Sequence, residues 1–312
     1  MSTRIFTSRS RRRVRRRLVL VTCAAGAALA LLAGWLAFAA GRSSSTATAP
    51  GPADPGAVHV HGLGVDPVDR VLYAATHTGL FRISEDGSAE RVGDRYHDLM
   101  GFTVAAVDDF VASGHPDLRD DTLQRSDAPP LLGLVTSADR GASWQEGSLL
   151  GETDFHTLQA GHGQIYGWDA TGGRFMVSSD RKEWETRSEV PLTDFAVSPE
   201  DPEVVIGTTA AGVVRSDDGG RSWTPDGEHA YVAVEWSPEA LWAVAADGRL
   251  DVSTDGGRTW ESRGTLEGPP EAFEADGDLL IAALPDRGIV TSSDAGATWS
   301  LRYQPESAQG GA

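Results

Sequence analysis

Histidine is the residue through which this 312-residue chain could do chemistry, because seven of its eight histidines fall between positions 59 and 162. Neutral imidazoles are common ligands of zinc and copper, and nearby carboxylates can complete the coordination shell. Six histidines form the candidate metal-ligand set: His59, His61, His77, His97, His115 and His156. Four further residues are candidate ligand-binding residues: Asp98, Asp117, Asp154 and Arg119. The pattern predicts a ligand-binding surface that holds zinc or copper.

A recurring motif, S-x-D-x-G-x-x-W, marks the elements that must position these histidines. Its aspartates stand at positions 139, 180, 218, 255 and 294, so the copies are 37 to 41 residues apart. Four copies fit the pattern, whereas the copy at 178–184 is one residue short and lacks the glycine. A fixed period in this range is typical of repeat architectures.

Each motif reads as a hairpin. A short apolar run precedes it, Asp and Gly supply a tight turn, and Trp opens the next strand, where its ring can pin the hairpin to the rest of its unit. Every period also contains two earlier strand-like runs, such as 194–197 and 204–208. Four short antiparallel strands per period form a propeller blade. We therefore predict an all-β fold, a six-bladed β-propeller over residues 58–303.

The predicted blades bring the six candidate ligands to one face. In a four-stranded meander, the link into the first strand and the link from the second to the third strand lie on the same face. His59, His61, His97 and His156 fall in links of the first kind, and His77 and His115 in links of the second kind. All six should lie over blades one to three. For any single histidine, hydrogen bonding to a neighbouring loop is the alternative interpretation.

Outside the propeller, the N-terminus predicts export. Residues 1–17 are a basic segment expected in the cytoplasm, and the uncharged apolar run 18–40 is long enough for a transmembrane anchor, although a cleaved signal peptide is the alternative. Residues 41–57 read as a flexible linker and 304–312 as a disordered tail. The propeller is therefore expected on the extracytoplasmic side of the cell membrane, or secreted.

The charge of the chain excludes one class of partner. Eight of the 27 basic residues precede residue 18, which leaves 19 against 45 acidic residues in the exported part. Such an acidic surface disfavours nucleic acid. We expect a monomer whose partner is a small ligand, a glycan or an exported protein, with the membrane contacted through the N-terminal segment.

The repeated hairpin resembles the Asp-box (BNR) hairpin of sialidase-like β-propellers, over roughly residues 58 to 303. In that family the Asp-box is a folding element remote from the active site, which implies a structural role for the motif residues. The strings at 59–64, 75–81, 100–102 and 113–116 are similar to those of exported bacterial Asp-box propellers labelled as glycosyl hydrolases. The resemblance implies a propeller fold. The glycosyl hydrolase label of these proteins rests on the repeat, so it does not imply a mechanism.

Three functions remain open at this point. The favoured one is a ligand-binding propeller with a histidine-rich face; the others are a glycoside hydrolase of the exo-sialidase kind and an assembly scaffold for a membrane complex. A sialidase needs three arginines, a Tyr-Glu pair and an Asp acid. Here Tyr231 with Glu235 is a candidate pair, but the arginines Arg119, Arg125 and Arg287 form no recognisable triad. Whether the chain is an enzyme is left open by the sequence.

Overall fold

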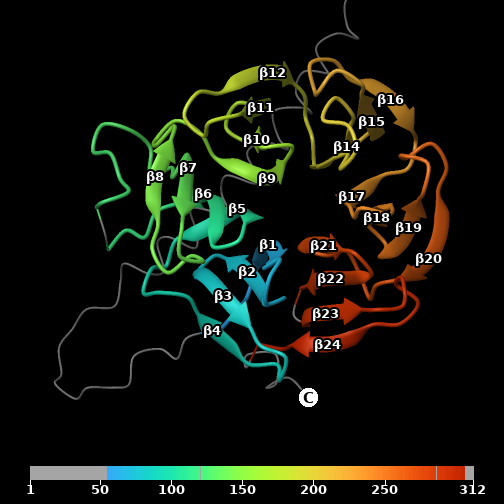
Figure 1. Ribbon diagram of the computed structural model, residues 1–312, viewed down its shortest axis with the longest axis horizontal. Coiled ribbons are helices and arrows are strands. Elements are labelled where there is room, and N and C mark those ends of the chain that lie inside the picture. Colours follow the sequence, from blue (N-terminus) through green and yellow to red (C-terminus); the bar gives the residue numbers. More distant parts are fainter. Residues whose placement is uncertain (1–54, 120, 286, 306–312) are drawn as a thin grey trace, which may run out of the picture. The chain divides into compact units, whose positions relative to one another are not determined.

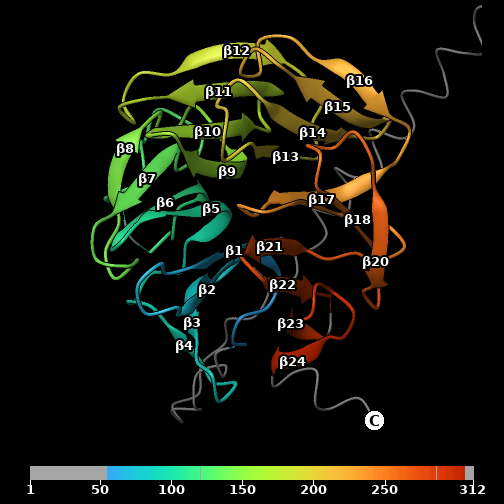
Figure 2. The same cartoon turned by 45° about the vertical axis from the view of Figure 1, so that its right-hand side comes forward.

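The computed structural model describes residues 55–119, 121–285 and 287–305. The segments 1–17 and 18–40, and most of the predicted linker and tail, lie outside these residues. Within them, 24 strands form six four-stranded sheets, each a meander of consecutive antiparallel strands. Figures 1 and 2 show the sheets arranged around a common centre, with the first strand of each innermost and the fourth outermost. The predicted six-bladed β-propeller is confirmed.

The blades follow one another along the chain. Blades one and two comprise β1 (Val60–Val65), β2 (Leu72–Thr76), β3 (Gly79–Ile83), β4 (Ala89–Arg91), β5 (Asp98–Ala106), β6 (Asp109–His115), β7 (Leu134–Ser137) and β8 (Gln145–Ser148). Blades three and four comprise β9 (Phe155–Gly161), β10 (Gln164–Asp169), β11 (Arg174–Ser178), β12 (Glu185–Glu189), β13 (Asp194–Val197), β14 (Val205–Thr209), β15 (Gly212–Ser216) and β16 (Thr224–Gly227). Blades five and six comprise β17 (Tyr231–Trp236), β18 (Leu241–Ala245), β19 (Arg249–Ser253), β20 (Glu261–Thr265), β21 (Ala272–Asp276), β22 (Leu279–Leu284), β23 (Gly288–Ser292) and β24 (Ser300–Tyr303).

The recurring turns owe their shape to a hydrogen-bonded Ser-Asp pair. In the copy of blade four, Ser216 Oγ donates to Asp218 Oδ1 over 2.7 Å and accepts from the amide of Gly220 over 2.7 Å. The amide and hydroxyl of Ser222 donate to the same carboxylate over 2.8 and 2.6 Å. Gly220 has a φ of 88°, and a Cβ there would collide with the ring of Phe175 in the preceding blade. The motif therefore fixes a turn and also a close approach between blades.

The motif tryptophans join neighbouring blades, which differs from the expectation that each pins a hairpin to its own blade. The indole of Trp184 donates to Ser148 Oγ of blade two, and that of Trp223 donates to Ser188 Oγ of blade three, each over 2.9 Å. The Trp223 ring also packs edge-on against Phe175, with ring centroids 5.4 Å apart. At these two contacts between blades, apolar burial is combined with one directional hydrogen bond.

Blade one closes the ring against blade six. The amide of Ala57 donates to the Tyr303 hydroxyl over 3.0 Å, and the amide of Val60 donates to Glu271 over 3.2 Å. Ala57 itself is buried in a cluster with residues of β22 and β23. The chain is therefore anchored to the propeller from residue 57 onward.

Among the residues that the structure describes, no helix is long and apolar enough to cross a membrane.

Candidate functional site

The first strands of the six blades line a central cavity of about 610 Å³. Its lining changes character around the ring. Blades one to three contribute His61, Met100 and His156, whereas blades four to six contribute Asp194, Glu235 and Glu274. We call the last three residues the carboxyl wall. The imidazoles belong to a larger group, the histidine cluster, which comprises His61, His77, Asp98, His115, Asp154 and His156.

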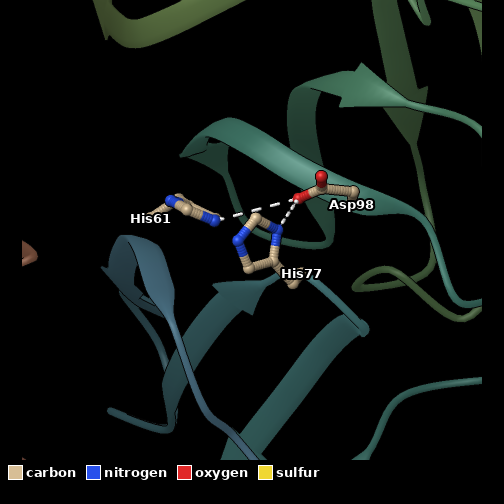
Figure 3. Close-up of side chains that lie close together, drawn as sticks. All are labelled: His61, His77 and Asp98. Carbon is tan, nitrogen blue, oxygen red and sulfur yellow. Dashed lines mark hydrogen bonds and ion pairs between the residues drawn. The ribbon is translucent and has the colours of Figure 1, made fainter. Parts of the chain in front are cut away.

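The centre of the histidine cluster is Asp98, at the start of β5. His61 reaches it from β1, where a β-bulge lies between Val60 and Gly62, and His77 reaches it from the turn between β2 and β3. Asp98 Oδ1 lies 2.7 Å from His77 Nδ1 and 3.8 Å from His61 Nε2, and both rings point toward it (Figure 3). One potential ligand atom from each of these three residues lies within 4.8 Å of the others. That spacing is short enough for one metal ion to draw the three together.

The cluster continues from the second oxygen of Asp98 into blades two and three. Asp98 Oδ2 lies 3.6 Å from His115 Nδ1, and the other nitrogen of that ring lies 3.8 Å from Asp154 Oδ2. His156 Nε2 is 3.0 Å from the same Asp154 oxygen. The structure thus brings together four of the six predicted histidines and two of the predicted aspartates.

The environment of the cluster favours neutral imidazole at His61 and charged carboxylate at Asp98. Burial, followed by the neighbouring His77, lowers the pKa of His61 to about 4. Burial alone would raise the pKa of Asp98, but contacts with His115 and His77 outweigh it and lower that pKa. His61 Nε2 is buried and has no hydrogen-bond partner among the described residues. A neutral nitrogen without a partner beside a carboxylate is a ready pair of metal ligands.

Two predicted histidines occupy other settings. His59 lies at the edge of the cluster: its ring centroid is 5.4 Å from that of His77, its Nδ1 is 3.6 Å from Glu271, and its side chain is 66% exposed. His97 is buried, and its Nδ1 accepts a hydrogen bond from the amide of Asp117 over 2.9 Å. This bond occupies one nitrogen of His97 in holding the long loop that follows β6.

Asp117 and Arg119 lie with His97 in that loop. The Asp117 carboxylate accepts from the backbone amides of Tyr96 and Arg119 and from the Arg119 guanidinium, and the bond from the guanidinium contributes most to a strongly lowered pKa. The guanidinium also stacks on the Tyr96 ring, 4.2 Å from its centroid. These contacts fasten the loop to the chain before β5. A ligand-binding role for this pair stays a prediction.

The carboxyl wall was missed by sequence reasoning, apart from Glu235. Burial raises the pKa of Asp194 to about 7, although the amides of Val234 and Phe195 donate to its carboxylate. Burial and the neighbouring Glu274 also raise the pKa of Glu235, which accepts from Gln159 Nε2 over 3.0 Å. The available signal was an acidic residue in a largely apolar first strand in each of blades four, five and six, with Asp276 as a second acid in the strand of blade six.

Tyr231 and Glu235 do not form the pair considered for a glycosidase nucleophile. The Tyr231 hydroxyl is buried and donates to Asp251 Oδ2 over 2.7 Å. A β-bulge between Tyr231 and Ala233 breaks the alternation of β17, so a four-residue spacing no longer places both side chains on one face.

No protein-family model matches this sequence, and comparison with curated protein sequences also finds no match. Solved structures do share its fold. A chain of the nidogen/laminin complex matches 76% of this chain and 94% of its own length, with a TM-score of 0.59 and 11% identity. The GH74 xyloglucanase of Xanthomonas campestris matches 79% of this chain at a TM-score of 0.54 and 15% identity, over 46% of its own length. PorZ, a surface component of the type-IX secretion system of Porphyromonas gingivalis, matches 80% of this chain at a TM-score of 0.52 and 11% identity, over 38% of its own length. At these identities the similarity establishes a β-propeller fold that glycoside hydrolases and a secretion component share.

Proposed function

We propose that this protein is an extracytoplasmic ligand-binding propeller whose histidine cluster binds a zinc or copper ion. The observation that carries the proposal is the convergence of His61, His77 and Asp98, whose ligand atoms lie within 4.8 Å of one another. Two imidazoles and a carboxylate are typical of zinc sites that keep a position open for a ligand. The resemblance of the recurring turns to Asp-box hairpins supports an exported propeller, tethered through residues 18–40 or secreted.

The placement of the three residues also favours access by an ion. The side chains of His77 and Asp98 are 45% and 28% exposed, and His61 lines the central cavity. Asp98 supplies the negative charge, and among the described residues its ion-pair contacts are with imidazoles only. Among the described residues, a cation that binds here meets no Lys or Arg charge in contact with Asp98, and it must displace the 2.7 Å hydrogen bond between His77 Nδ1 and Asp98 Oδ1.

The test is calorimetric titration of the metal-stripped full chain, purified in detergent without a His tag, with zinc and with copper. We expect a dissociation constant tighter than about 10 μM. The double variant His61→Ala/His77→Ala should bind at least about 100-fold more weakly, because both imidazole ligands are lost.

The matched control removes two histidines outside the cluster, His162→Ala/His229→Ala. His162 bonds the carbonyl of Ser198, and His229 stacks on Tyr231 in blade five. This variant should bind like the wild type. Weaker binding than 10 μM by the wild type for both metals, or wild-type affinity in the His61/His77 variant, would refute the proposal.

A glycoside hydrolase is the second candidate function, and the carboxyl wall is the observation that favours it. Glycosidases need one carboxyl that keeps its proton and a second that acts as base or nucleophile. The raised pKa values of Asp194 and Glu235 suit the first role. Release of reducing ends from xyloglucan, abolished by Glu235→Gln and retained in His61→Ala/His77→Ala, would support this reading; activity retained in Glu235→Gln would contradict it.

A further inference from the structure

Asp98 has a second carboxylate oxygen that an ion at His61 and His77 leaves unused, and His115 lies beside it. Asp98 and His115 stand opposite each other in the pairing of β5 with β6, and Asp98 Oδ2 lies 3.6 Å from His115 Nδ1. Asp98 Oδ1 lies 2.7 Å from His77 Nδ1. One oxygen of Asp98 therefore faces the candidate metal ligands, and the other faces His115.

The backbone next to His115 permits this approach. A β-bulge in β5 lies between Leu99 and Gly101, and Gly114 in β6 has a φ of 132°. A Cβ at Gly114 would lie 2.1 Å from the carbonyl oxygen of Asp98, so a larger residue would force the two strands apart. The bulge and the glycine thus set the position of His115 relative to Asp98.

An acid of blade three faces the other nitrogen of the His115 ring. His115 Nε2 lies 3.8 Å from Asp154 Oδ2, so Asp98 and Asp154 face opposite nitrogens of one imidazole. Both separations are longer than a hydrogen bond but within the range of an ion pair. Because each ring nitrogen faces an acid, His115 would have to turn away from one of them to bind a metal ion.

Asp154 can orient this ring because its own position is fixed. It is 7% exposed, and its amide donates to Asp169 Oδ1 over 3.2 Å. The amide of Phe155 donates to the buried hydroxyl of Ser113 in β6 over 2.9 Å, which ties blade three to blade two. His156 Nε2 lies 3.0 Å from Asp154 Oδ2. The acid is therefore held both through the backbone and through its carboxylate.

We propose that His115 is a positioning residue for the metal site. Asp154 orients the His115 ring, and the ring holds Asp98 Oδ2. Asp98 Oδ1 is then presented to the ion together with His61 and His77. Partners of this kind orient ligating groups, and their loss typically weakens metal binding about 10- to 100-fold. This inference rests on the proposed function, because it concerns the same ion.

The first test is calorimetric titration of the metal-stripped full chain with zinc and with Cu(II). His115→Ala should bind the metal about 10- to 100-fold more weakly than the wild type, because Asp98 is no longer held. His115→Asn, whose amide nitrogen can take the place of Nδ1, should restore most of the affinity. His162→Ala is the matched control and should bind like the wild type, since His162 bonds the carbonyl of Ser198 instead. Thermal melting confirms that each variant is folded.

A double-mutant cycle tests whether His115 acts through Asp98. Asp98→Asn keeps an oxygen ligand but removes the charge that faces His115. In the Asp98→Asn background, His115→Ala should weaken metal binding by less than about twofold, because the group through which it acts is already changed. Asp154→Asn should weaken binding in the wild type and have little further effect in His115→Ala.

Pulsed electron paramagnetic resonance of the Cu(II)-loaded protein identifies the coordinated imidazoles. The wild type and His115→Ala should both show those of His61 and His77 and no third one. A coordinated imidazole that is lost in His115→Ala would show that His115 is a ligand, and would overturn the positioning role. Wild-type affinity in His115→Ala, or an undiminished effect of that change in Asp98→Asn, would also overturn it while the proposed function stands. No binding of either metal by the wild type would overturn both.

Discussion

The histidine cluster and the carboxyl wall occupy comparable places in the fold, yet they shift the pKa values of their acids in opposite directions. Asp98 stands on the first strand of blade two, and Asp194 stands on the first strand of blade four. Imidazole contacts lower the pKa of Asp98, whereas burial raises that of Asp194 to about 7. Among the described residues, no Lys, Arg or His forms an ion pair with any member of the carboxyl wall. The difference in pKa therefore follows from the burial and the partners of each acid rather than from its position in the blade.

The two halves of the cavity therefore differ in the pKa values of their acidic residues. A metal ion needs deprotonated ligands, so the histidine cluster offers a better cation site at neutral pH than the carboxyl wall does. Protonated carboxyls instead donate hydrogen bonds, which suits an uncharged polar ligand or a general acid. The two walls are therefore separable by mutation and by pH.

The largest effect should come from breaking the packing behind the carboxyl wall. The Trp260 ring lies 5.0 Å from that of Tyr231 and joins the apolar cluster of blades four and five. Trp260→Ala should lower the free energy of unfolding by about 3–5 kcal/mol, as large-to-small changes at packed sites do. Chemical denaturation measures it, and the metal affinity of the folded fraction should not change.

Leu301→Ala is the control for this change, since Leu301 is 59% exposed and its loss should alter stability by no more than about 0.5 kcal/mol. Wild-type stability in Trp260→Ala would refute the structural role of the motif tryptophans. Lost metal affinity in its folded fraction would show instead that the two regions are not independent.

A smaller effect should distinguish the walls by pH. Burial, followed by the neighbouring Asp276, raises the pKa of Glu274 to about 8, above the usual value near 4.3. Between these values the folded state holds a proton that the unfolded state has released, so Glu274 lowers stability as pH rises. Glu274→Gln, which mimics the protonated form, should match the wild type at pH 4 and be more stable by about 1 kcal/mol or more at pH 8.

Asp278→Asn provides the matched control, because Asp278 is exposed in the turn after β21. Its effect on the unfolding free energy should be small and the same at both pH values. If Glu274→Gln differs from the wild type by an equal amount at pH 4 and pH 8, the carboxyl wall is ionised in the folded protein and the contrast with Asp98 is wrong.

The sequence predicted the fold well because its signal is periodic. The aspartates at 139, 180, 218, 255 and 294 mark repeats, and each period carries four strand-like runs, so the blade count follows from spacing. The meander rule predicted that six histidines, among them His61, His77, His115 and His156, would lie on one face of blades one to three, because it depends on loop order alone. That rule does not predict the direction of a side chain. The His97 side chain accepts a hydrogen bond from the amide of Asp117, in the loop that follows β6.

The carboxyl wall could not be predicted in the same way. Asp194, Glu235 and Glu274 stand in separate blades, 39 to 41 residues apart, and only closure of the ring brings them together. A single acid in an apolar strand is ambiguous, because it can face solvent as readily as a central cavity. The failed pairing of Tyr231 with Glu235 has a local cause, since the β-bulge in β17 is not evident from residue types.

The most direct test of the contrast between the walls is to locate the metal. Crystals of the metal-stripped protein reloaded with zinc, measured at the zinc absorption edge, give an anomalous difference map. The account predicts a peak about 2.0–2.2 Å from nitrogens of His61 and His77 and from an oxygen of Asp98. A strongest peak on Asp194, Glu235 and Glu274, or no peak in the propeller, would contradict it.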